Sequence, residues 1–332
     1  MKSKMLGRPG YERLLRCSSS SECATILSEQ GYLDSVTIPS GGLDPNSWQA
    51  LFERKTVALI HKLARLSPQD CAQLLTAYEN RYRLESLKSG LRLMAANVER
   101  DGASSITTPE LTTDFVRGIV ETRNLERLAQ VTGASAIYGE ISSVVSEGRP
   151  LALVEGIVDK HGLALLWRAT DMSDMIDRQS AQPLVGEQID TLNLLLVARS
   201  KALGIAEDEI RTILAPVNYR LGDALSEATS SGSTTNALRA FTKTIYASSV
   251  GQFLETYKEG DSLHPLDSSL RRWHAARCLA AFSGFPFCAG LPLAFTYLMG
   301  YEASDLQSII LGKENGLSAD AIEEFLILWK TL

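Results

Sequence analysis

The sequence predicts an all-α protein built from three related helical units, and two observations lead to this prediction. Apolar residues recur at helical spacing along most of the 332-residue chain, whereas strict alternation of apolar and polar residues, the mark of a strand, is scarce. One leucine-centred motif also occurs three times, as SLKSGLRLM around Leu87, NLLLVARSK around Leu194 and DLQSIILGK around Leu306. Self-similarity at a fixed period indicates repeated structural units.

The repeat extends beyond this motif. A 107-residue offset relates Leu87 to Leu194, and a 112-residue offset relates Leu194 to Leu306 and also places Glu155 on Asp267. The combined 219-residue offset places Tyr78 on Tyr297. Because one register carries several matches, we divide the chain into three helical repeats, which span residues 8–105, 110–216 and 217–332.

Each repeat is expected to contain a short helix pair, then a helix of acidic and apolar residues, and last the long helix that carries the leucine motif. In the first repeat, residues 51–66 keep one apolar stripe toward a core. Ser67 is then expected to cap the next helix, with Pro68 at its first position. This helix is expected to run toward Met94.

Similar start signals return later in the chain. Residues 107–110 (TTPE) predict a helix start in the second repeat, and Ser318 predicts one in the third. The acidic run at residues 207–209 (EDE) is also expected at a helix start, where carboxylates complement the helix dipole. Polar breaks at residues 101–108 and 215–218 separate the repeats.

Composition excludes some classes of protein. Hydrophobic residues make up 45% of the chain and charged residues 22%, as in ordinary globular domains. The net charge of −6, without any lysine- or arginine-rich run, argues against nucleic-acid binding, which needs a concentrated basic surface. The N-terminal residues lack the apolar core of a signal peptide.

The cysteines are odd in number and form no CxxC pair, which predicts reduced thiols in a cytosolic compartment rather than disulfides or a zinc site. They are Cys17, Cys23, Cys71, Cys278 and Cys288.

Residues 278–301 contain no charged side chain. As one helix, a segment of this length could cross a bilayer. Gly284, Pro286, Gly290 and Pro292 interrupt this segment, and proline removes a helical donor. Two short buried helices joined by a tight loop are therefore favoured, with membrane insertion or close approach to a membrane protein as the alternative.

Few residues suggest chemistry. Gly312-Lys313 lacks the earlier glycine and the Ser/Thr of a phosphate-binding loop, so Lys313 is interpreted as a lysine at a helix C-terminus. Asp171, Asp174 and Asp177 have a spacing of three, which would place the carboxylates near one helix face and could hold Mg²⁺ with a diphosphate. A solvated acidic face is the favoured interpretation of these aspartates.

The histidines are dispersed and are expected at the surface or an interface, and GxSxG-type nucleophile signatures are absent. The tryptophans are expected to anchor helices to the core.

The leucine motifs, taken in order, resemble those of the C subunit of archaeal and bacterial A/V-type rotary ATPases, a relative of the eukaryotic d subunit. In the third copy the matching residues are Tyr297, Leu298, Glu302, Asp305, Leu306, Ile309, Ile310, Gly312, Lys313, Gly316, Leu317 and Ile322. In the second they are Ile189, Asp190, Asn193, Leu194, Arg199 and Lys201, and the first matches more thinly with Leu87, Lys88, Leu91 and Arg92. Leu311 departs from the pattern by replacing an arginine, and Asp305 and Ser86 by replacing asparagines.

This resemblance implies a funnel of three helical bundles around a pseudo-threefold axis. Such a protein would stand on the cytoplasmic face of the membrane as a peripheral part of a larger complex, between the proteolipid ring and the D and F subunits of the central shaft. It would be a non-catalytic rotor part that transmits torque for ATP synthesis or ion pumping. No cofactor, nucleic acid or small-molecule substrate is expected.

The motif positions are the candidate contact residues, although the same positions could serve helix packing. They are Leu87, Arg92, Asp190, Leu194, Arg199, Glu302, Leu306 and Lys313. A helical adaptor of another assembly is the alternative function. A magnesium-dependent helical enzyme that uses Asp171, Asp174 and Asp177 is a more remote one.

Overall fold

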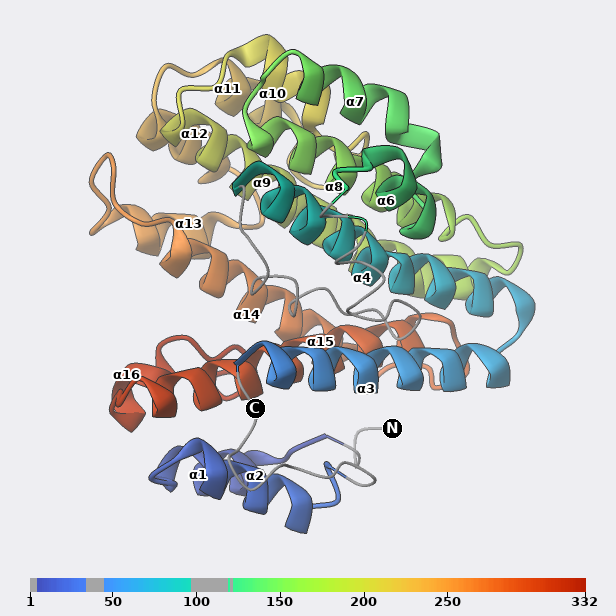
Figure 1. The fold of residues 1–332 in the computed structure, drawn as a ribbon, viewed down its shortest axis with the longest axis vertical. Helices are drawn as coiled ribbons and strands as arrows, with labels where there is room; N and C mark the ends of the chain where they lie inside the picture. Colours follow the sequence, from blue (N-terminus) through green and yellow to red (C-terminus); the bar gives the residue numbers. More distant parts are fainter. Residues whose placement is uncertain (1–4, 34–44, 97–118, 120–121) are drawn as a thin grey trace.

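The computed structural model describes residues 5–33, 45–96, 119 and 122–332. Throughout these residues the regular structure is helical, without a β-strand, which confirms the all-α prediction (Figure 1).

Three long antiparallel helix pairs form the body of the molecule, and each pair belongs to one predicted repeat. They are α3 (Pro45–Leu66) with α4 (Gln69–Ala96), α8 (Leu151–Arg168) with α9 (Met175–Ala202), and α14 (His264–Ala281) with α15 (Gly290–Glu314). We call the first member of each pair the middle helix and the second the long helix. The long helices carry the three leucine motifs.

Shorter helices surround these pairs. Before the middle helices come α1 (Arg8–Arg16) and α2 (Ser20–Glu29); α6 (Leu125–Val131), the 3₁₀ turn η3 (Ser135–Ile137) and α7 (Tyr138–Ser146); and α11 (Asp223–Ser230), α12 (Thr234–Phe241) and α13 (Ala247–Leu254). After the long helices come α10 (Glu207–Ile213) and α16 (Ala319–Glu323).

The long helices contact the next repeat in a cyclic order. Each packs on its own middle helix and also on that of the following repeat: α4 on α8, α9 on α14, and α15 on α3. Since the third repeat thereby contacts the first, elements from the two ends of the chain lie together (Figure 1).

The motif leucines explain this order, because each is buried in a different hydrophobic cluster. Leu87 packs in a cluster with residues of α6 and α8, Leu194 in one with residues of α12 and α14, and Leu306 in one with residues of α1 to α3. Every cluster therefore joins a long helix to the next repeat. Burial of apolar side chains, at about 25 cal/mol per Å² of apolar surface, is the main force that holds the repeats together.

The predicted helix starts have different outcomes. Ser318 caps α16 by accepting a hydrogen bond from the Ala321 amide (3.2 Å), and residues 207–209 form the first turn of α10, as predicted. The prediction for Ser67 is wrong, because α4 begins at Gln69 and the Ser67 hydroxyl instead donates to the Leu63 carbonyl of α3 (2.8 Å). The starts and breaks predicted within residues 101–110 lie outside the described residues.

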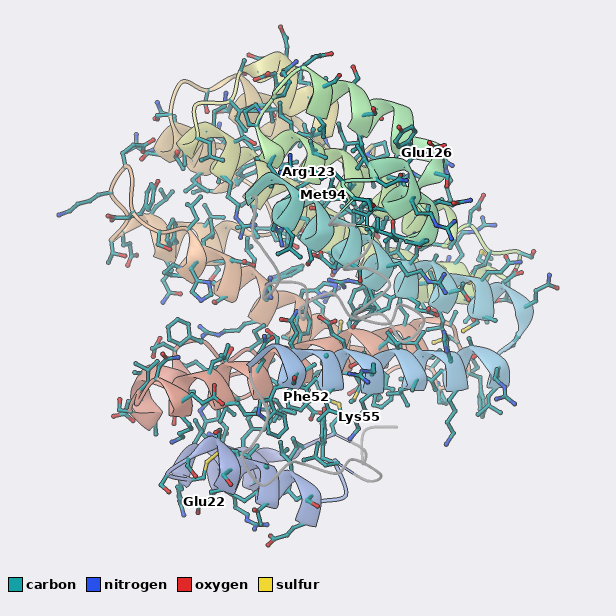
Figure 2. The ribbon with its side chains drawn as sticks, in the orientation of Figure 1. Glu22, Phe52, Lys55, Met94, Arg123 and Glu126 are labelled. Atoms are coloured by element: carbon teal, nitrogen blue, oxygen red, sulfur yellow. A yellow bond between two sulfur atoms is a disulfide. The ribbon has the colours of Figure 1, made fainter. Side chains whose placement is uncertain are left out.

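The prediction of reduced cysteines is wrong for one pair. Cys17 and Cys23 are joined by a disulfide, whereas Cys71, Cys278 and Cys288 are free (Figure 2). The turn between α1 and α2 brings the two Cα atoms to 6.2 Å, a usual separation for a disulfide. Spacing along the sequence does not reveal that the end of one helix meets the start of the next.

The uncharged segment 278–301 is divided between the end of α14, a loop at residues 282–289 and the start of α15. Two helices with a loop between them were expected, but they are parts of long helices rather than short ones. Phe285 and Phe287 are exposed on the loop. Among the described helices, none combines the length and apolar character that a bilayer crossing requires.

Candidate functional site

The three turns between middle and long helices lie at one end of the molecule. The Ser173 amide donates to Asp70 at the start of α4 (3.0 Å), and the Ala289 amide donates to Asp177 at the start of α9 (2.7 Å). These two bonds connect the turn of the second repeat to that of the first, and the turn of the third repeat to that of the second. All three turns lie toward the same side in Figure 1.

Large apolar side chains are exposed on these turns. We call this surface the apolar end, and its members are Leu66, Met175, Ile176, Phe285 and Phe287. Phe287 is 82% exposed and Leu66 76%. Clustered apolar exposure of this kind is typical of surfaces that contact a partner.

The three aspartates considered for Mg²⁺ lie beside this end, but not on one helix face, because α9 begins only at Met175. Asp174 caps α9 by accepting from the Ile176 and Asp177 amides, and Asp171 faces Arg178 at 3.5 Å. With Asp177 bound to the Ala289 amide, each carboxylate has a separate structural role. Within the described residues, no group of three or more His, Cys, Asp or Glu could hold a metal ion.

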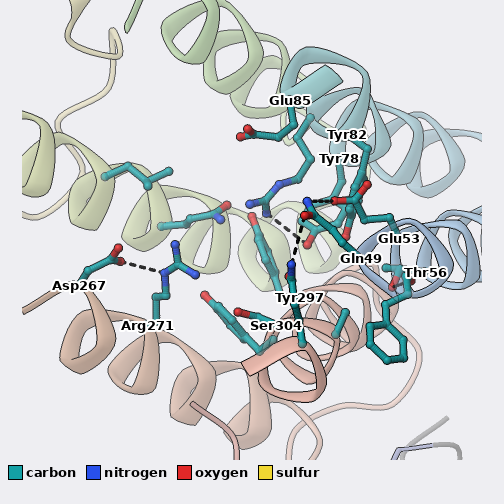
Figure 3. A pocket seen from close by; sticks show the side chains of 18 of the residues that line it. Gln49, Glu53, Thr56, Tyr78, Tyr82, Glu85, Asp267, Arg271, Tyr297 and Ser304 are labelled. Carbon is teal, nitrogen blue, oxygen red and sulfur yellow. Dashed lines mark hydrogen bonds and ion pairs between the residues drawn. The ribbon is translucent and has the colours of Figure 1, made fainter. Parts of the chain in front are cut away.

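A cavity of ≈ 380 Å³ lies between the helix pairs, and we call it the central cavity. Its walls come from α3, α4, α9, α14 and α15, and therefore from all three repeats (Figure 3). Its buried lining residues include Tyr78, Gln188 and Tyr297, and its more exposed ones include Arg92.

The central cavity lies toward the end of the molecule opposite the apolar end, since α3 and α14 line it with their first halves, far from the turns. The buried Tyr78 and Tyr297 lie in the first half of α4 and α15, near the turns, whereas Arg92 and Gln307 lie in the second half of the same helices. At a rise of about 1.5 Å for each residue, the two sets are separated by about 15–20 Å along the helices. We call the side of the cavity that Arg92 and Gln307 line, which is the side farthest from the turns, its rim.

Ion pairs on this rim connect successive repeats. Arg92 of α4 pairs with Glu155 of α8 at 2.6 Å, and Arg199 of α9 pairs with Asp267 of α14 at 2.8 Å. The two arginines are related by the 107-residue offset and the two acids by the 112-residue offset, so the same contact occurs twice. Asp267 also accepts from Arg271 at 2.8 Å (Figure 3). Two arginines therefore pair with one carboxylate.

A second kind of contact uses buried carboxylates of the long helices. Asp190 of α9 accepts from the Arg220 amide at 2.6 Å and from the Tyr246 hydroxyl at 3.1 Å. We call this contact the Asp190 seam, since it joins the second repeat to the third. Burial raises the pKa of Asp190 to about 6, although hydrogen bonds from Tyr219, Arg220 and Tyr246 oppose that rise.

Glu302 of α15 occupies the position that the 112-residue offset assigns to Asp190. It accepts from the Leu6 amide at 2.5 Å, and Tyr32 lies beside it. The same sequence offset relates Leu6 to Arg220 and Tyr32 to Tyr246. Leu6 and Tyr32 are therefore the counterparts, in the first repeat, of Arg220 and Tyr246 in the third. We call this contact the Glu302 seam. Burial raises the pKa of Glu302 to about 7, with the Leu6 amide and Tyr32 opposing the shift.

One turn farther along, each long helix binds the segment that follows it. Asn193 accepts from the Ala215 amide (3.0 Å), and Asp305 accepts from the Ile327 and Leu328 amides (2.7 and 2.8 Å) and from the Tyr11 hydroxyl (3.1 Å). The 112-residue offset again relates Ala215 to Ile327. Burial raises the pKa of Asp305 to about 6 against these hydrogen bonds.

The predicted contact residues therefore fall into four groups. Leu87, Leu194 and Leu306 are core residues, and Asp190 and Glu302 are buried in the seams. Lys313 lies in the last turn of α15, as predicted, and donates to the Leu15 carbonyl of α1 (2.6 Å). Arg92 and Arg199 are half exposed beside the cavities between repeats.

The histidines were expected at the surface or an interface, and His274 is not at the surface, because only 1% of it is exposed. Its ring nitrogens contact the Tyr301 hydroxyl (2.8 Å) and the Leu184 carbonyl (2.9 Å). Burial lowers the pKa of His274 to about 4, although the bond to the Leu184 carbonyl opposes this shift. The imidazole is therefore neutral, and it packs between Tyr301, which lines the central cavity, and Leu184.

Sequence comparison gives one consistent result. A profile of the family described as ATP synthase (C/AC39) subunit matches residues 1–325. The chain is 25% identical to the C subunit of the A-type ATP synthase of Methanosarcina mazei, over 99% of this chain and 90% of that protein. It is 20% identical to that of Methanocaldococcus jannaschii, over 98% and 83%, and 24% identical to that of Methanosarcina barkeri, over 99% and 90%.

Proposed function

Because the chain belongs to the ATP synthase (C/AC39) subunit family, we propose that it is a non-catalytic rotor part that joins the membrane proteolipid ring to the D and F subunits of the shaft. In this role it transmits torque for ATP synthesis or ion pumping. It stands as a peripheral subunit on the cytoplasmic face of the membrane. The cyclic contacts of α4, α9 and α15 support a funnel around a pseudo-threefold axis.

One observation carries this proposal: the molecule has two different ends. The apolar end gathers exposed apolar side chains from three adjoining turns, and the central cavity lies toward the opposite end of the molecule. We assign the apolar end to the proteolipid ring and the central cavity to the shaft. A coupling part between two partners requires two separate surfaces of this kind.

Rigidity supports the same role. The Glu302 seam ties α15 to the N-terminal segment, and Arg92 and Arg199 tie each long helix to the next middle helix. A torque applied to any one repeat is thereby shared with the other two.

The test is a pull-down of this chain with purified proteolipid ring and, separately, with purified D–F shaft. The double variant Phe285→Ser/Phe287→Ser should lose the ring and retain the shaft, whereas Arg271→Glu should weaken the shaft and retain the ring. Leu203→Ser, which alters a side chain 67% exposed at the far end of α9, is the matched control and should bind both. If the unaltered chain binds neither partner, the proposal is wrong and a helical adaptor of another assembly replaces it.

A further inference from the structure

The three turns at the apolar end differ in length and composition. The turn of the first repeat consists of residues 67–68, that of the second of residues 169–174 and that of the third of residues 282–289. The second contains two aspartates, whereas the last contains no charged residue. We call residues 282–289 the third turn. Its residues 283–287 are all exposed, and it carries both aromatic members of the apolar end, Phe285 and Phe287.

The two phenylalanine rings of the third turn lie together at its tip. Their centroids are 5.8 Å apart and their planes are inclined at 68°, an edge-to-face arrangement that aromatic pairs favour. The Cys288 thiol donates to the Phe285 carbonyl (3.1 Å) and closes the tip behind them. More than half of each phenylalanine is nevertheless exposed, so the pair forms one compact apolar projection.

The base of the third turn is fixed to α9 of the preceding repeat. The Ala289 amide donates to Asp177 (2.7 Å), and the next amide, that of Gly290, donates to the Ser180 hydroxyl (2.9 Å). Gly290 approaches α9 so closely that a Cβ atom at this position would lie 2.6 Å from the Ser180 carbonyl oxygen. Glycine allows such an approach because it has no side chain. The projection is therefore held in place before any partner binds.

A fixed projection favours a partner of definite shape. Ordering a flexible loop on binding costs free energy, and a loop already held in its bound conformation avoids that cost. This advantage is largest against a recess in a protein, since a fluid bilayer accepts apolar side chains in many arrangements. Aromatic side chains that fill such recesses often carry most of the binding energy of an interface.

We propose that the third turn is an aromatic anchor, whose Phe285 and Phe287 insert together into an apolar recess of the proteolipid ring. Asp177, Ser180 and Gly290 are positioning residues that hold the anchor ready for insertion. This inference rests on the proposed function, since the ring is its partner. Ring binding is then concentrated at the third repeat instead of being spread evenly over the three turns.

The test is titration of the full chain against proteolipid ring in phosphatidylcholine nanodiscs, with empty nanodiscs of the same lipid alongside. Phe287→Ser should weaken ring binding by about tenfold to a hundredfold, the loss expected for one buried phenylalanine. Leu66→Ser is the comparison on the first turn, because Leu66 is 76% exposed and Phe287 82%. This second variant should weaken ring binding by less than about threefold, as contacts around an anchor usually do.

The positioning residues are tested with both phenylalanines intact. Gly290→Ala forces α15 away from the Ser180 carbonyl and should weaken ring binding by about tenfold. Asp177→Ala should weaken it by about threefold to tenfold, and Asp177→Asn, which keeps an acceptor for the Ala289 amide, should restore most of that loss. Gly251→Ala is the matched control, because a Cβ atom there meets nothing within 4 Å, and it should bind like the unaltered chain.

The thermal midpoint of each variant and its binding to the D–F shaft separate a displaced turn from a misfolded chain. If Gly290→Ala loses shaft binding as well, the Asp177→Ala and Asp177→Asn pair decides the role of the positioning residues. If Leu66→Ser weakens ring binding as much as Phe287→Ser does, or if the folded positioning variants bind the ring like the unaltered chain, this inference is wrong and the proposed function stands.

The empty nanodiscs test the lipid as partner. If Phe287→Ser abolishes binding to empty nanodiscs and leaves ring binding unchanged, the third turn is a lipid contact and the inference is again wrong. If the unaltered chain does not bind the ring, the inference and the proposed function are both wrong.

Discussion

The Asp190 seam and the Glu302 seam use the same interactions at different points of the chain. In each, a buried carboxylate of a long helix accepts a backbone amide just ahead of the next repeat's first helix and lies beside a tyrosine of that repeat. Arg220 follows Asp190 closely in sequence, whereas Leu6 and Glu302 lie near opposite ends of the chain. The same contact therefore joins neighbours along the chain in one case and closes the cycle in the other. Four predictions test how far the two are equivalent.

The largest effect is expected at the residues one turn beyond the seams. Asp305→Ala leaves the Ile327 and Leu328 amides and the Tyr11 hydroxyl without an acceptor, and we expect the free energy of unfolding to fall by about 4 kcal/mol. Asn193→Ala should cost about 2 kcal/mol, because the hydrogen bonds of a neutral amide are weaker than those of a carboxylate. Urea denaturation checks both values. Equal losses would show that the contact between the third and first repeats adds no more to the free energy of unfolding than its counterpart within the chain.

The second prediction concerns pH. Glu302 has a folded pKa of about 7 against an ordinary value of 4.5, so its contribution to stability is complete below pH 4.5 and is lost as pH rises through 7. At about 1.4 kcal/mol per pKa unit, the loss by pH 8 is about 3 kcal/mol. Glu302→Gln keeps the acceptor for Leu6 without the buried charge, so it should be more stable than the parent at pH 8 and equal to it at pH 4. Unfolding curves at both pH values check this, and a pH-independent difference would contradict it.

The third prediction compares the tyrosines. Tyr246→Phe removes a hydroxyl that donates to Asp190 (3.1 Å) and contacts the Glu187 carbonyl (3.3 Å), and should cost about 1 kcal/mol. Tyr32→Phe should cost a similar amount if the two seams are equivalent. Thermal unfolding of the paired variants measures the difference, and a loss confined to one of them would show that only that seam depends on its tyrosine.

The smallest effect is expected on the rim. Arg92→Ala and Arg199→Ala each remove an ion pair of a half-exposed arginine, and we expect each to cost below about 1 kcal/mol because solvent screens such pairs. A double-mutant cycle between Arg199 and Asp267 measures the coupling directly. A coupling well above that range would show that the rim stabilises the repeats as strongly as the seams do.

Periodicity and the repeat register were sufficient to predict the helical class, and the leucine motif predicted the family. The motif residues were harder to interpret, because a leucine that packs against the next repeat looks the same in sequence as one that contacts a partner. Leu87, Leu194 and Leu306 prove to be core residues. The offsets did indicate that Glu155 corresponds to Asp267, which are the acids of the two rim pairs.

The central cavity was not predicted from the sequence. Arg81 and Gln188 are related by the 107-residue offset, but their side chains differ, and their common place in the cavity wall depends on how α4 and α9 approach each other in space. Tyr78 and Tyr297 gave a partial signal, since the 219-residue offset relates them, and their rings meet edge to face at 4.7 Å. The disulfide between Cys17 and Cys23 likewise depends on a turn angle that composition does not encode.

The separation of Leu6 from Glu302 has a consequence for synthesis on the ribosome. The α1 and α2 helices emerge first, but α15, which packs on α2 and binds Leu6, is translated only near the end of the chain. The Asp190 seam can form as soon as the third repeat begins to emerge. The Glu302 seam cannot form until α15 has emerged, so it becomes possible only after the Asp190 seam has begun to form, and the nascent α1 and α2 helices spend the intervening time without α15.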